Sequence, residues 1–291
     1  MARWPDDPEE TARQPRERVA RCLEAVAENM DSEPALVELG GSLLLAGDTH
    51  GDTTVTRAVV KRFFAQGYDH LVFLGDYVDR APPDEVSSLV NLNYLLFLKQ
   101  AHPRRVILLK GNHEAHHLLP FSPYDFRGEV ARFYPGLYDA YVRVFERMPL
   151  MVLAHHVYAA HGGILPGHNR EALRRVDKNK PSVVEAITWS DPVISPTFRG
   201  AGQRYGRETL DGFLEGIDAR LFIKGHDYST LGAAIFGGRC LTIFSSRRYR
   251  NKGQGGVLVA EVEGPVEGVE DVRVMDYYSS GKWRPYRVKI A

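Results

Sequence analysis

Short apolar runs, each ending in a polar cluster, recur along the chain from residue 43 onward, and every cluster except the one after residue 244 contains glycine. The runs are 43–46, 71–74, 106–109, 157–160, 221–223 and 241–244. Runs of this length bounded by glycine are typical of buried strands rather than helices. Before them, Val19, Leu23 and Val26 lie at helical spacing, which predicts an amphipathic helix from Arg16 to about Met30.

The order of these elements predicts an α/β fold. Helix-compatible segments near 53–66 and 84–100 separate the first three strands, and a β-α-β-α-β order predicts parallel strands covered by helices. The stretch from about 220 to 291 is richer in strands, so a second, more antiparallel sheet is expected there. Residues 1–15 are charged and rich in proline, which predicts a flexible arm. Because no linker divides the remainder, we expect a single domain over 16–291.

Composition narrows the class of protein. The chain has 291 residues, with 37 Lys plus Arg and 37 Asp plus Glu, so it carries no net charge. This balance gives no long-range attraction to nucleic acid or to an anionic membrane, and we expect neither as a partner. The start of the chain lacks a signal-peptide pattern, and no apolar run approaches the ~18 residues of a membrane span. Cys22 and Cys240 are expected to be free core thiols, and the protein is expected to be cytoplasmic.

The polar clusters hold the candidate chemistry, because ligands of parallel sheets bind beyond the carboxyl ends of the strands. The clusters are Gly47-Asp48-Thr49-His50-Gly51-Asp52, Gly75-Asp76-Tyr77-Val78-Asp79-Arg80, Gly111-Asn112-His113-Glu114, His161-Gly162-Gly163 and Lys224-Gly225-His226. Asp, Asn and His offer oxygen and nitrogen donors that suit Mn, Fe or Zn. A single Gly-Asp-x-His-Gly is a weak signal, whereas five clusters at five predicted strand ends predict a metal site.

The first three clusters resemble the signature motifs of the phosphoprotein phosphatase family, type 1/2A-like serine/threonine phosphatases within the calcineurin-like metallophosphoesterase superfamily. The similarity extends over roughly residues 35–260, through Pro149, Trp189-Ser190-Asp191-Pro192, Arg199-Gly200, Gly206, Phe244-Ser245 and Tyr249. It implies the metallophosphoesterase β-sandwich flanked by helices, with a dinuclear metal site at the C-terminal strand ends.

The resemblance also implies a role for each matching residue. The metal ligands would be Asp48, His50, Asp76, Asn112, His161 and His226, with Asp76 bridging two divalent ions. We favour Mn²⁺, with Fe and Zn as alternatives. The phosphate would be bound by Arg80, Arg199, Asn112 and Tyr249, and the catalytic pair His113 and Asp79 would protonate the leaving alcohol.

Elementary chemistry supports these roles. Two divalent ions ~3.5–4 Å apart can clamp both the attacking and the leaving oxygen, and they lower the pKa of a bound water toward ~7. A planar guanidinium matches a phosphate with paired donors. Because an alkoxide is a poor leaving group, a general acid is expected, and such a group typically contributes ~10²–10⁴-fold.

The predicted function is therefore a metal-dependent protein serine/threonine phosphatase that hydrolyses phosphomonoesters of phosphorylated proteins by direct attack of a metal-bound hydroxide. The nearest alternative is a nucleotide hydrolase of the same superfamily that cleaves dinucleoside polyphosphates. An inactive phosphoprotein-binding module would require a missing ligand, and none is missing. Zero net charge and the lack of a basic stripe argue against a nuclease. The sequence indicates no particular regulatory subunit.

Some features leave alternatives open. Arg204 and Arg207 compete with Arg199 for the phosphate role. His113-Glu114-Ala115-His116-His117 also spells the zinc-protease pattern His-Glu-x-x-His, but that pattern needs a continuous helix, and here it follows a strand directly.

The chain departs from the family pattern around the site. Ala81 replaces the usual Gly, Asp52 stands where Gln or Cys is common, and Arg247-Arg248 alters the loop before Tyr249. These departures remove no ligand, but they put substrate choice in doubt. In the unusual segment 116–134, Phe121, Tyr124, Phe126 and Arg127 either shape a substrate groove or simply pack, and we favour packing.

Overall fold

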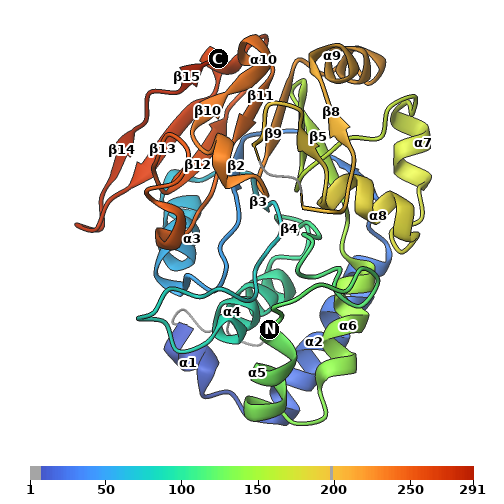
Figure 1. The fold of residues 1–291 in the computed structure, drawn as a ribbon. Helices are drawn as coiled ribbons and strands as arrows, with labels where there is room; N and C mark the ends of the chain where they lie inside the picture. The colour runs from blue at the N-terminus through green and yellow to red at the C-terminus, as the bar shows by residue number, and fades with distance from the viewer. Residues whose placement is uncertain (1–7, 197–198) are drawn as a thin grey trace.

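The computed structural model describes residues 8–196 and 199–291 and contains two large β-sheets packed face to face, with helices on the outside (Figure 1). The seven-stranded sheet has the order β1 (Leu36–Glu38), β5 (Met151–Ala154), β6 (Val157–Ala160), β9 (Leu221–Lys224), β11 (Cys240–Thr242), β10 (Ala233–Ala234) and β15 (Lys289–Ile290). The six-stranded sheet has the order β14 (Trp283–Pro285), β13 (Arg273–Tyr277), β12 (Leu258–Val262), β2 (Leu43–Ala46), β3 (His70–Phe73) and β4 (Val106–Leu108). A short pair joins β7 (Asp191–Pro192) to β8 (Arg204–Tyr205).

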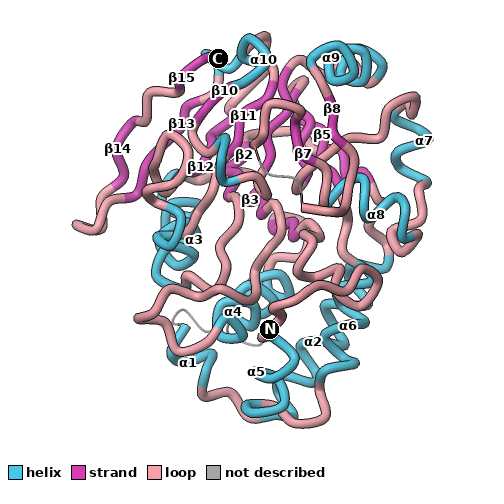
Figure 2. Tube along the Cα trace, in the orientation of Figure 1, coloured by secondary structure: helices cyan, strands magenta, loops and turns pink. Residues whose placement is uncertain are grey.

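Helices cover both outer faces of this sandwich. The α-helices are α1 (Pro8–Ala12), α2 (Arg16–Asp31), α3 (Thr53–Gln66), α4 (Ser88–Ala101), α5 (Phe126–Phe133), α6 (Tyr138–Arg147), α7 (Arg170–Arg175), α8 (Pro181–Thr188), α9 (Arg207–Gly216) and α10 (Ile235–Gly238). Short 3₁₀ helices are η1 (Tyr228–Thr230), η2 (Arg247–Tyr249) and η3 (Val269–Asp271). In Figure 2 the strands gather in the upper part of the view, while α2, α4, α5 and α6 lie together in the lower part. Within the described ranges, no helix has both the length and the apolarity to cross a bilayer.

Alternation along the strands explains the layers. In β2, Leu43 and Leu45 belong to the hydrophobic cluster shared by both sheets, whereas Leu44 and Ala46 belong to the cluster that contains α2, α3 and α4. Successive side chains of a strand point to opposite faces, so β2 is buried on both sides. A third cluster packs the outer face of the seven-stranded sheet against α7, α8 and α9. The predicted β-sandwich flanked by helices is confirmed.

The predicted parallel order β2–β3–β4 is also found, with α3 and α4 as the crossovers. The expectation for the C-terminal stretch was partly wrong. The antiparallel strands β12, β13 and β14 do not form a separate sheet, because β12 pairs with the free edge of β2 and extends the six-stranded sheet. The other sheet draws its strands from along the chain, and β6, β9 and β11 in it are parallel. Pairing of the β2 edge satisfies backbone groups that would otherwise be buried without partners.

The N-terminal stretch differs in part from the flexible arm expected over 1–15. Residues 1–7 lie outside the described residues, but α1 follows them and packs against α4. Thr11 is fully buried, and the Tyr134 hydroxyl donates a hydrogen bond to the Gln14 carbonyl at 3.2 Å. Residues 8–14 are therefore held on the domain, because burial of this short helix offsets its low intrinsic stability.

Candidate metal and phosphate site

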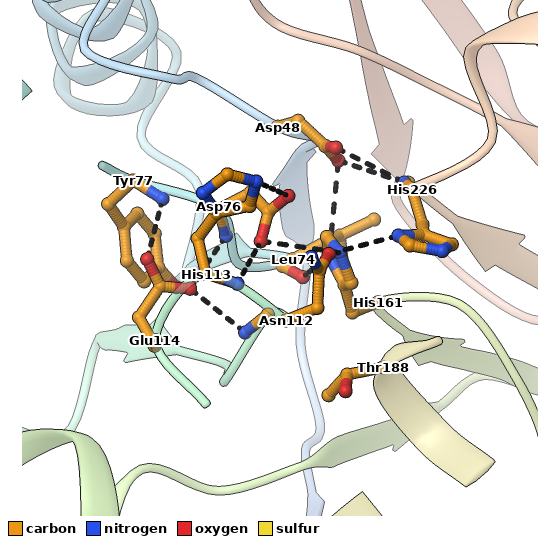
Figure 3. Close-up of polar contacts among 12 residues, drawn as sticks. Asp48, Leu74, Asp76, Tyr77, Asn112, His113, Glu114, His161, Thr188 and His226 are labelled. Atoms are coloured by element: carbon orange, nitrogen blue, oxygen red, sulfur yellow. Dashed lines mark hydrogen bonds and ion pairs between the residues drawn. The ribbon is translucent and has the colours of Figure 1, made fainter. Parts of the chain in front are cut away.

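The six expected metal ligands lie at neighbouring strand ends. Asp48 and His50 follow β2, Asp76 follows β3, Asn112 follows β4, His161 follows β6 and His226 follows β9. Each is at most 3% exposed. Figure 3 shows the side chains of Asp48, Asp76, Asn112, His161 and His226 pointing toward one another. The fold thus collects polar side chains from two sheets in one buried place.

Asp76 lies at the centre of this group. Its Oδ2 is 3.4 Å from the Nε2 of His50, and its Oδ1 is 3.4 Å from the Nε2 of His161. The two carboxylate oxygens therefore face different ligand candidates. This is the arrangement that a carboxylate bridging two cations requires.

A second set of contacts surrounds Asn112. Its Oδ1 is 3.0 Å from His161 Nε2 and 3.0 Å from His226 Nδ1 (Figure 3). Asp48 accepts the backbone N–H of His226 at 3.1 and 3.2 Å, and its Oδ1 is 4.0 Å from His161 Nδ1. Among the described residues, the acidic and histidine groups whose donor atoms all lie within 4.8 Å of one another are His50–Asp76–His113 and Asp48–Asp76–His161, and both include Asp76.

The backbone at the site is unusually strained. His50, Asp76, Asp79, Arg80 and His226 all have positive φ, between 42° and 64°. Such values are uncommon for residues with a Cβ, and each costs of order 1–3 kcal/mol. The surrounding fold must supply this free energy. Five of the nine non-glycine residues with positive φ in the described chain lie in these loops, and backbone strain of this kind is common at functional sites.

Two glycines allow the ligands to approach this closely. A Cβ on Gly225 would lie 2.0 Å from Asp48 Oδ1, and a Cβ on Gly111 would lie 2.3 Å from Asp76 Oδ1. Both distances are shorter than any real contact. Glycine is therefore required at these two positions, because at each of them a carboxylate that follows another strand comes too close for a Cβ.

Backbone carbonyl groups orient two of the histidines. The Nδ1 of His50 lies 2.9 Å from the Val78 carbonyl oxygen, and the Nδ1 of His161 lies 2.9 Å from that of Leu74. When Nδ1–H donates to the carbonyl, the lone pair is on Nε2, which faces Asp76 in both cases. Outer partners of this kind are typical of metal-binding histidines.

Burial and the neighbouring charges shift the pKa values of the site in a way that favours a bound cation. Burial lowers the pKa of His50 to about 3, and burial with the nearby Arg199 holds the pKa of His226 well below its ordinary value. Burial alone would lower the pKa of His161, but Asp76 and Asp48 raise it to about 9. Burial alone would raise the pKa of Asp76, but His161 and His113 hold it well below its usual range. Without a metal, a proton on His161 is thus the local counter-charge, and a metal cation would replace it.

The donor set fits divalent metal ions of the Mn, Fe and Zn type. It combines neutral imidazoles, carboxylates and an amide oxygen in a buried setting. The Nδ1 of His226 faces Asn112 Oδ1 at 3.0 Å, whereas its Nε2 lies 3.8 Å from Asp191 Oδ1. Nδ1 is therefore the nitrogen of His226 that could coordinate a cation together with Asn112.

His113 and Asp79 form a tight pair beside Asp76. The Nδ1 of His113 is 2.5 Å from Asp79 Oδ2, and the other Asp79 oxygen accepts the backbone N–H groups of Asp125 and Phe126 at 2.8 and 2.7 Å. The Nε2 of His113 is buried, has no hydrogen-bond partner among the described residues and lies 3.9 Å from Asp76 Oδ2. This nitrogen therefore points toward the ligand group, by which we mean the six expected metal ligands Asp48, His50, Asp76, Asn112, His161 and His226. It could hold a proton there.

Arg80 and Tyr249 lie next to each other at the opening of the site. The Arg80 guanidinium interacts with the Tyr249 hydroxyl, and the rings of Tyr249 and His50 are 5.5 Å apart. Burial raises the pKa of Tyr249, and the neighbouring Arg80 opposes this rise. Both side chains therefore lie beside His50, one of the predicted metal ligands.

Arg199 lies on the other side, near His226. Its Nη2 donates to the His226 carbonyl at 3.1 Å, and its Nε donates to Asp191 Oδ2 at 3.2 Å. Arg204 instead donates to the Pro192, Val193 and Ser195 carbonyls, and Arg207 is an exposed residue of α9. Of the three candidate arginines, Arg199 is the one that the structure brings to the ligand group.

Two contributing residues were not assigned from the sequence. Glu114 is fully buried, and its carboxylate accepts the backbone N–H groups of Asp76, Tyr77 and Gly111 at 2.8, 2.9 and 3.0 Å. It thereby fixes the loop that carries Asp76, and its place in Gly111-Asn112-His113-Glu114 was the available signal. Asp191 holds Arg199, and the signal for it was Trp189-Ser190-Asp191-Pro192.

The structure distinguishes the alternatives that the sequence left open for the His-Glu-x-x-His pattern and for the aromatic residues of segment 116–134. Residues 112–118 form turns rather than the continuous helix that a zinc protease requires. The aromatic residues of the following segment pack: Phe121 contacts the rings of His113 and Trp189, and Tyr124 stacks on His116 with the ring centroids 3.6 Å apart. Cys22 and Cys240 are buried free thiols, as expected.

Comparison with known proteins agrees with this geometry. The family model described as "Calcineurin-like phosphoesterase" matches residues 41–229. The serine/threonine-protein phosphatase PP2A-like PPG1 of Candida albicans is 27% identical over 81% of this chain and 59% of its own length. A probable serine/threonine-protein phosphatase of Encephalitozoon cuniculi is 30% identical over 84% of this chain and 56% of its own length. The chain thus spans less than three fifths of the length of these two relatives.

At least two solved structures share the fold over most of the chain. A protein serine/threonine phosphatase from Saccharomyces cerevisiae, described as similar to human phosphatase PP5, superimposes with a TM-score of 0.75 at 23% identity, covering 90% of this chain and 89% of that one. A cold-active protein-tyrosine phosphatase of a Shewanella species superimposes with a TM-score of 0.58 at 19% identity, covering 89% and 84%. At these identities the likeness concerns the fold.

Proposed function

Since the chain belongs to the calcineurin-like phosphoesterase family, we propose that it is a metal-dependent protein serine/threonine phosphatase that hydrolyses phosphomonoesters. The observation that carries the proposal is Asp76, whose two oxygens face His50 and His161 at 3.4 Å each. The two relatives that are 27% and 30% identical are both named serine/threonine-protein phosphatases, which favours protein substrates over nucleotides.

In this proposal the six buried candidate ligands would hold two divalent ions, and Asp76 would contribute to the binding of both. Asp48 and His50 would hold one ion, and Asn112, His161 and His226 would hold the other. The ions would supply Lewis acidity toward the phosphate oxygens and a nucleophile at neutral pH. We propose Mn²⁺, with Fe and Zn as alternatives. All three metals accept the oxygen and nitrogen donors of this set.

The chain's own side chains would perform the remaining steps. Arg80 and Arg199 would bind the phosphate oxygens from two sides, with Tyr249 beside Arg80. The Nε2 of His113 would hold the proton that the departing alcohol takes up. Asp79, whose carboxylate is hydrogen-bonded to His113 Nδ1 at 2.5 Å, would be a positioning residue that orients the imidazole ring.

The leaving serine or threonine is neutralised as it departs, so no alkoxide is released.

We also propose a cytoplasmic location and phosphorylated proteins as the substrates, and we assign no regulatory subunit.

The proposal is tested by measuring metal content and substrate preference together. The protein is treated with EDTA, dialysed and reloaded with Mn²⁺. It is then assayed on phosphoserine and phosphothreonine peptides beside a dinucleoside tetraphosphate. We expect activity to be lost on chelation and restored with two ions per chain, with kcat/KM higher for the peptides. Cleavage of the nucleotide faster by orders of magnitude would replace this proposal with the nucleotide-hydrolase alternative.

A further inference from the structure

Three of the sequence departures noted above meet in space. Arg247, which opens η2, donates from Nε to both oxygens of Asp52 at 3.0 and 3.1 Å, and its backbone N–H donates to Asp52 Oδ2 at 2.6 Å. The next residue, Arg248, donates to the Ala81 carbonyl at 3.2 Å. The unusual residues at 52, 81 and 247–248 are therefore parts of one arrangement rather than independent changes.

Arg247 joins the loops that carry the site. Asp52 caps the N-terminus of α3 directly after His50, because its side chain accepts the Val55 N–H. The remaining Arg247 nitrogens donate to Asp84 at 2.6 Å and to Glu85 at 2.7 Å, in the loop after Arg80. We name these four residues, Arg247, Asp52, Asp84 and Glu85, the rim network. It fixes the backbone from which Arg248 extends.

Arg248 faces a cavity that borders the phosphate position. The cavity has a volume of about 450 Å³, and Arg80 and Arg248 are its two basic lining residues. Arg248 is exposed, and its contact with the Ala81 carbonyl uses only one guanidinium nitrogen. Its other nitrogens are therefore available to a bound group.

Most acidic groups of this cavity already have partners. Glu85 accepts from Arg247 and from the backbone N–H and hydroxyl of Thr54. Glu129 accepts from the hydroxyls of Ser87 and Ser88 and from the Leu89 N–H. Asp125 is exposed and lines the same cavity as Arg248. The lining holds two arginines and three carboxylates, of which Glu85 is paired with Arg247, so the cavity has no excess of positive charge, and its capacity to bind an anion rests on the free guanidinium donors of Arg248 beside Arg80.

We infer that Arg248 forms a specificity subsite that binds a second anionic group of the substrate, next to the phosphate that is hydrolysed. The group is a carboxylate or a further phosphate on a neighbouring residue of the phosphorylated chain. A guanidinium suits both, because it offers paired donors to two oxygens. This inference rests on the proposed function, which supplies the phosphorylated protein as substrate.

The test compares three phosphoserine peptides that differ at one neighbouring position, which is Asn, Asp or a second phosphoserine. The Mn²⁺-loaded protein is assayed, with an aryl phosphate as a separate substrate. We expect kcat/KM to be roughly threefold to tenfold higher for the anionic peptides than for the Asn peptide. The preference should shrink at high salt, because exposed charges are screened. A larger preference for the phosphoserine peptide than for the Asp peptide would identify the second phosphate as the favoured group.

Two variants of the cavity assign the preference to its residues. Arg248→Gln is expected to reduce the anionic-to-neutral ratio of kcat/KM to near one. Asp125→Asn is expected to raise the same ratio, because it removes a carboxylate of the cavity lining. Arg175→Gln, on an exposed arginine of α7 whose side chain is 78% exposed, is the matched control and should leave the ratio as in the wild type.

The outcomes separate this inference from the proposed function. An unchanged ratio in Arg248→Gln, or equal rates of the wild type on all three peptides, overturns the subsite while leaving the phosphatase in place. Hydrolysis of the aryl phosphate with no cleavage of any peptide overturns the protein-phosphatase proposal and the subsite with it. A wild-type unfolding midpoint for each variant shows that the ratio reports binding rather than folding.

Discussion

The ligand group and the rim network lie on the same loops but in different surroundings. In the ligand group, Asp76 and His161 have side-chain exposures of 3% and 0%. In the rim network, Arg247 is 28% exposed and its partner Asp84 is 65% exposed. Charges that are shielded from water act strongly and are little affected by salt, whereas exposed charges are screened. Substitutions in the buried group should therefore abolish catalysis, whereas substitutions in the rim network should alter substrate choice and stability.

The largest effect is expected from Asp76→Asn, which removes the central charge of the buried group. The variant should bind fewer than two ions and lose more activity than the ~10–100-fold typical of an outer-shell substitution. Metal analysis and kcat/KM on a phosphopeptide measure both effects. Asp218→Asn, at an aspartate whose side chain is 58% exposed, is the control. Full metal content and wild-type activity in Asp76→Asn would show that Asp76 is no bridge.

The next largest effect is expected from His113→Asn. It should retain metal while kcat on phosphoserine peptides falls by ~10²–10⁴-fold, because the proton donor is lost. Aryl phosphates, which have good leaving groups, should suffer much less. His113 also groups with His50 and Asp76 by distance, so loss of an ion together with equal losses on both substrates would identify it as a ligand instead.

A smaller effect is expected from Glu114→Gln, which changes a buried residue that would touch neither metal nor substrate. Burial, together with the neighbouring Asp76, raises the pKa of Glu114 to about 7, and its carboxylate holds three backbone N–H groups. Replacing one oxygen with an amide donor should disturb the Asp76 loop and lower metal affinity by ~10–100-fold. Titration of the metal-free protein with Mn²⁺ measures this. Unchanged affinity would show that the loop needs no such anchor.

The smallest effect is expected from Arg247→Met, which breaks the rim network. Stability should fall by about 1 kcal/mol, because the pair is partly exposed but Asp52 is left buried without its cation. KM for phosphopeptides should rise a few-fold with little change in kcat. Urea unfolding of Arg247→Met, Asp52→Asn and the double variant forms a cycle in which the double variant should recover part of the loss. Strictly additive effects would mean that the two residues do not act together.

Much of the fold was predictable because its signals are local. Leu43–Ala46 is a wholly apolar run that ends at Gly47, and α3 begins at Thr53, where Asp52 caps it. The six proposed ligands were named from their motifs, and the structure brings them together at the strand ends. Of the C-terminal strands, β12, β13 and β14 were assigned to the wrong sheet, because strand pairing depends on which edge is free and not on the residues of the strand alone.

The residue types available for catalysis, and the strand ends at which they lie, could be identified from local features of the chain, namely apolar runs, glycines and polar clusters. How these residues meet depends on the tertiary packing. It placed Asp76 between His50 and His161, directed Glu114 toward the backbone of the Asp76 loop, and paired Arg247 with an aspartate that lies 195 positions earlier. Such contacts depend on the packing of two sheets and their loops, which no short stretch of sequence specifies.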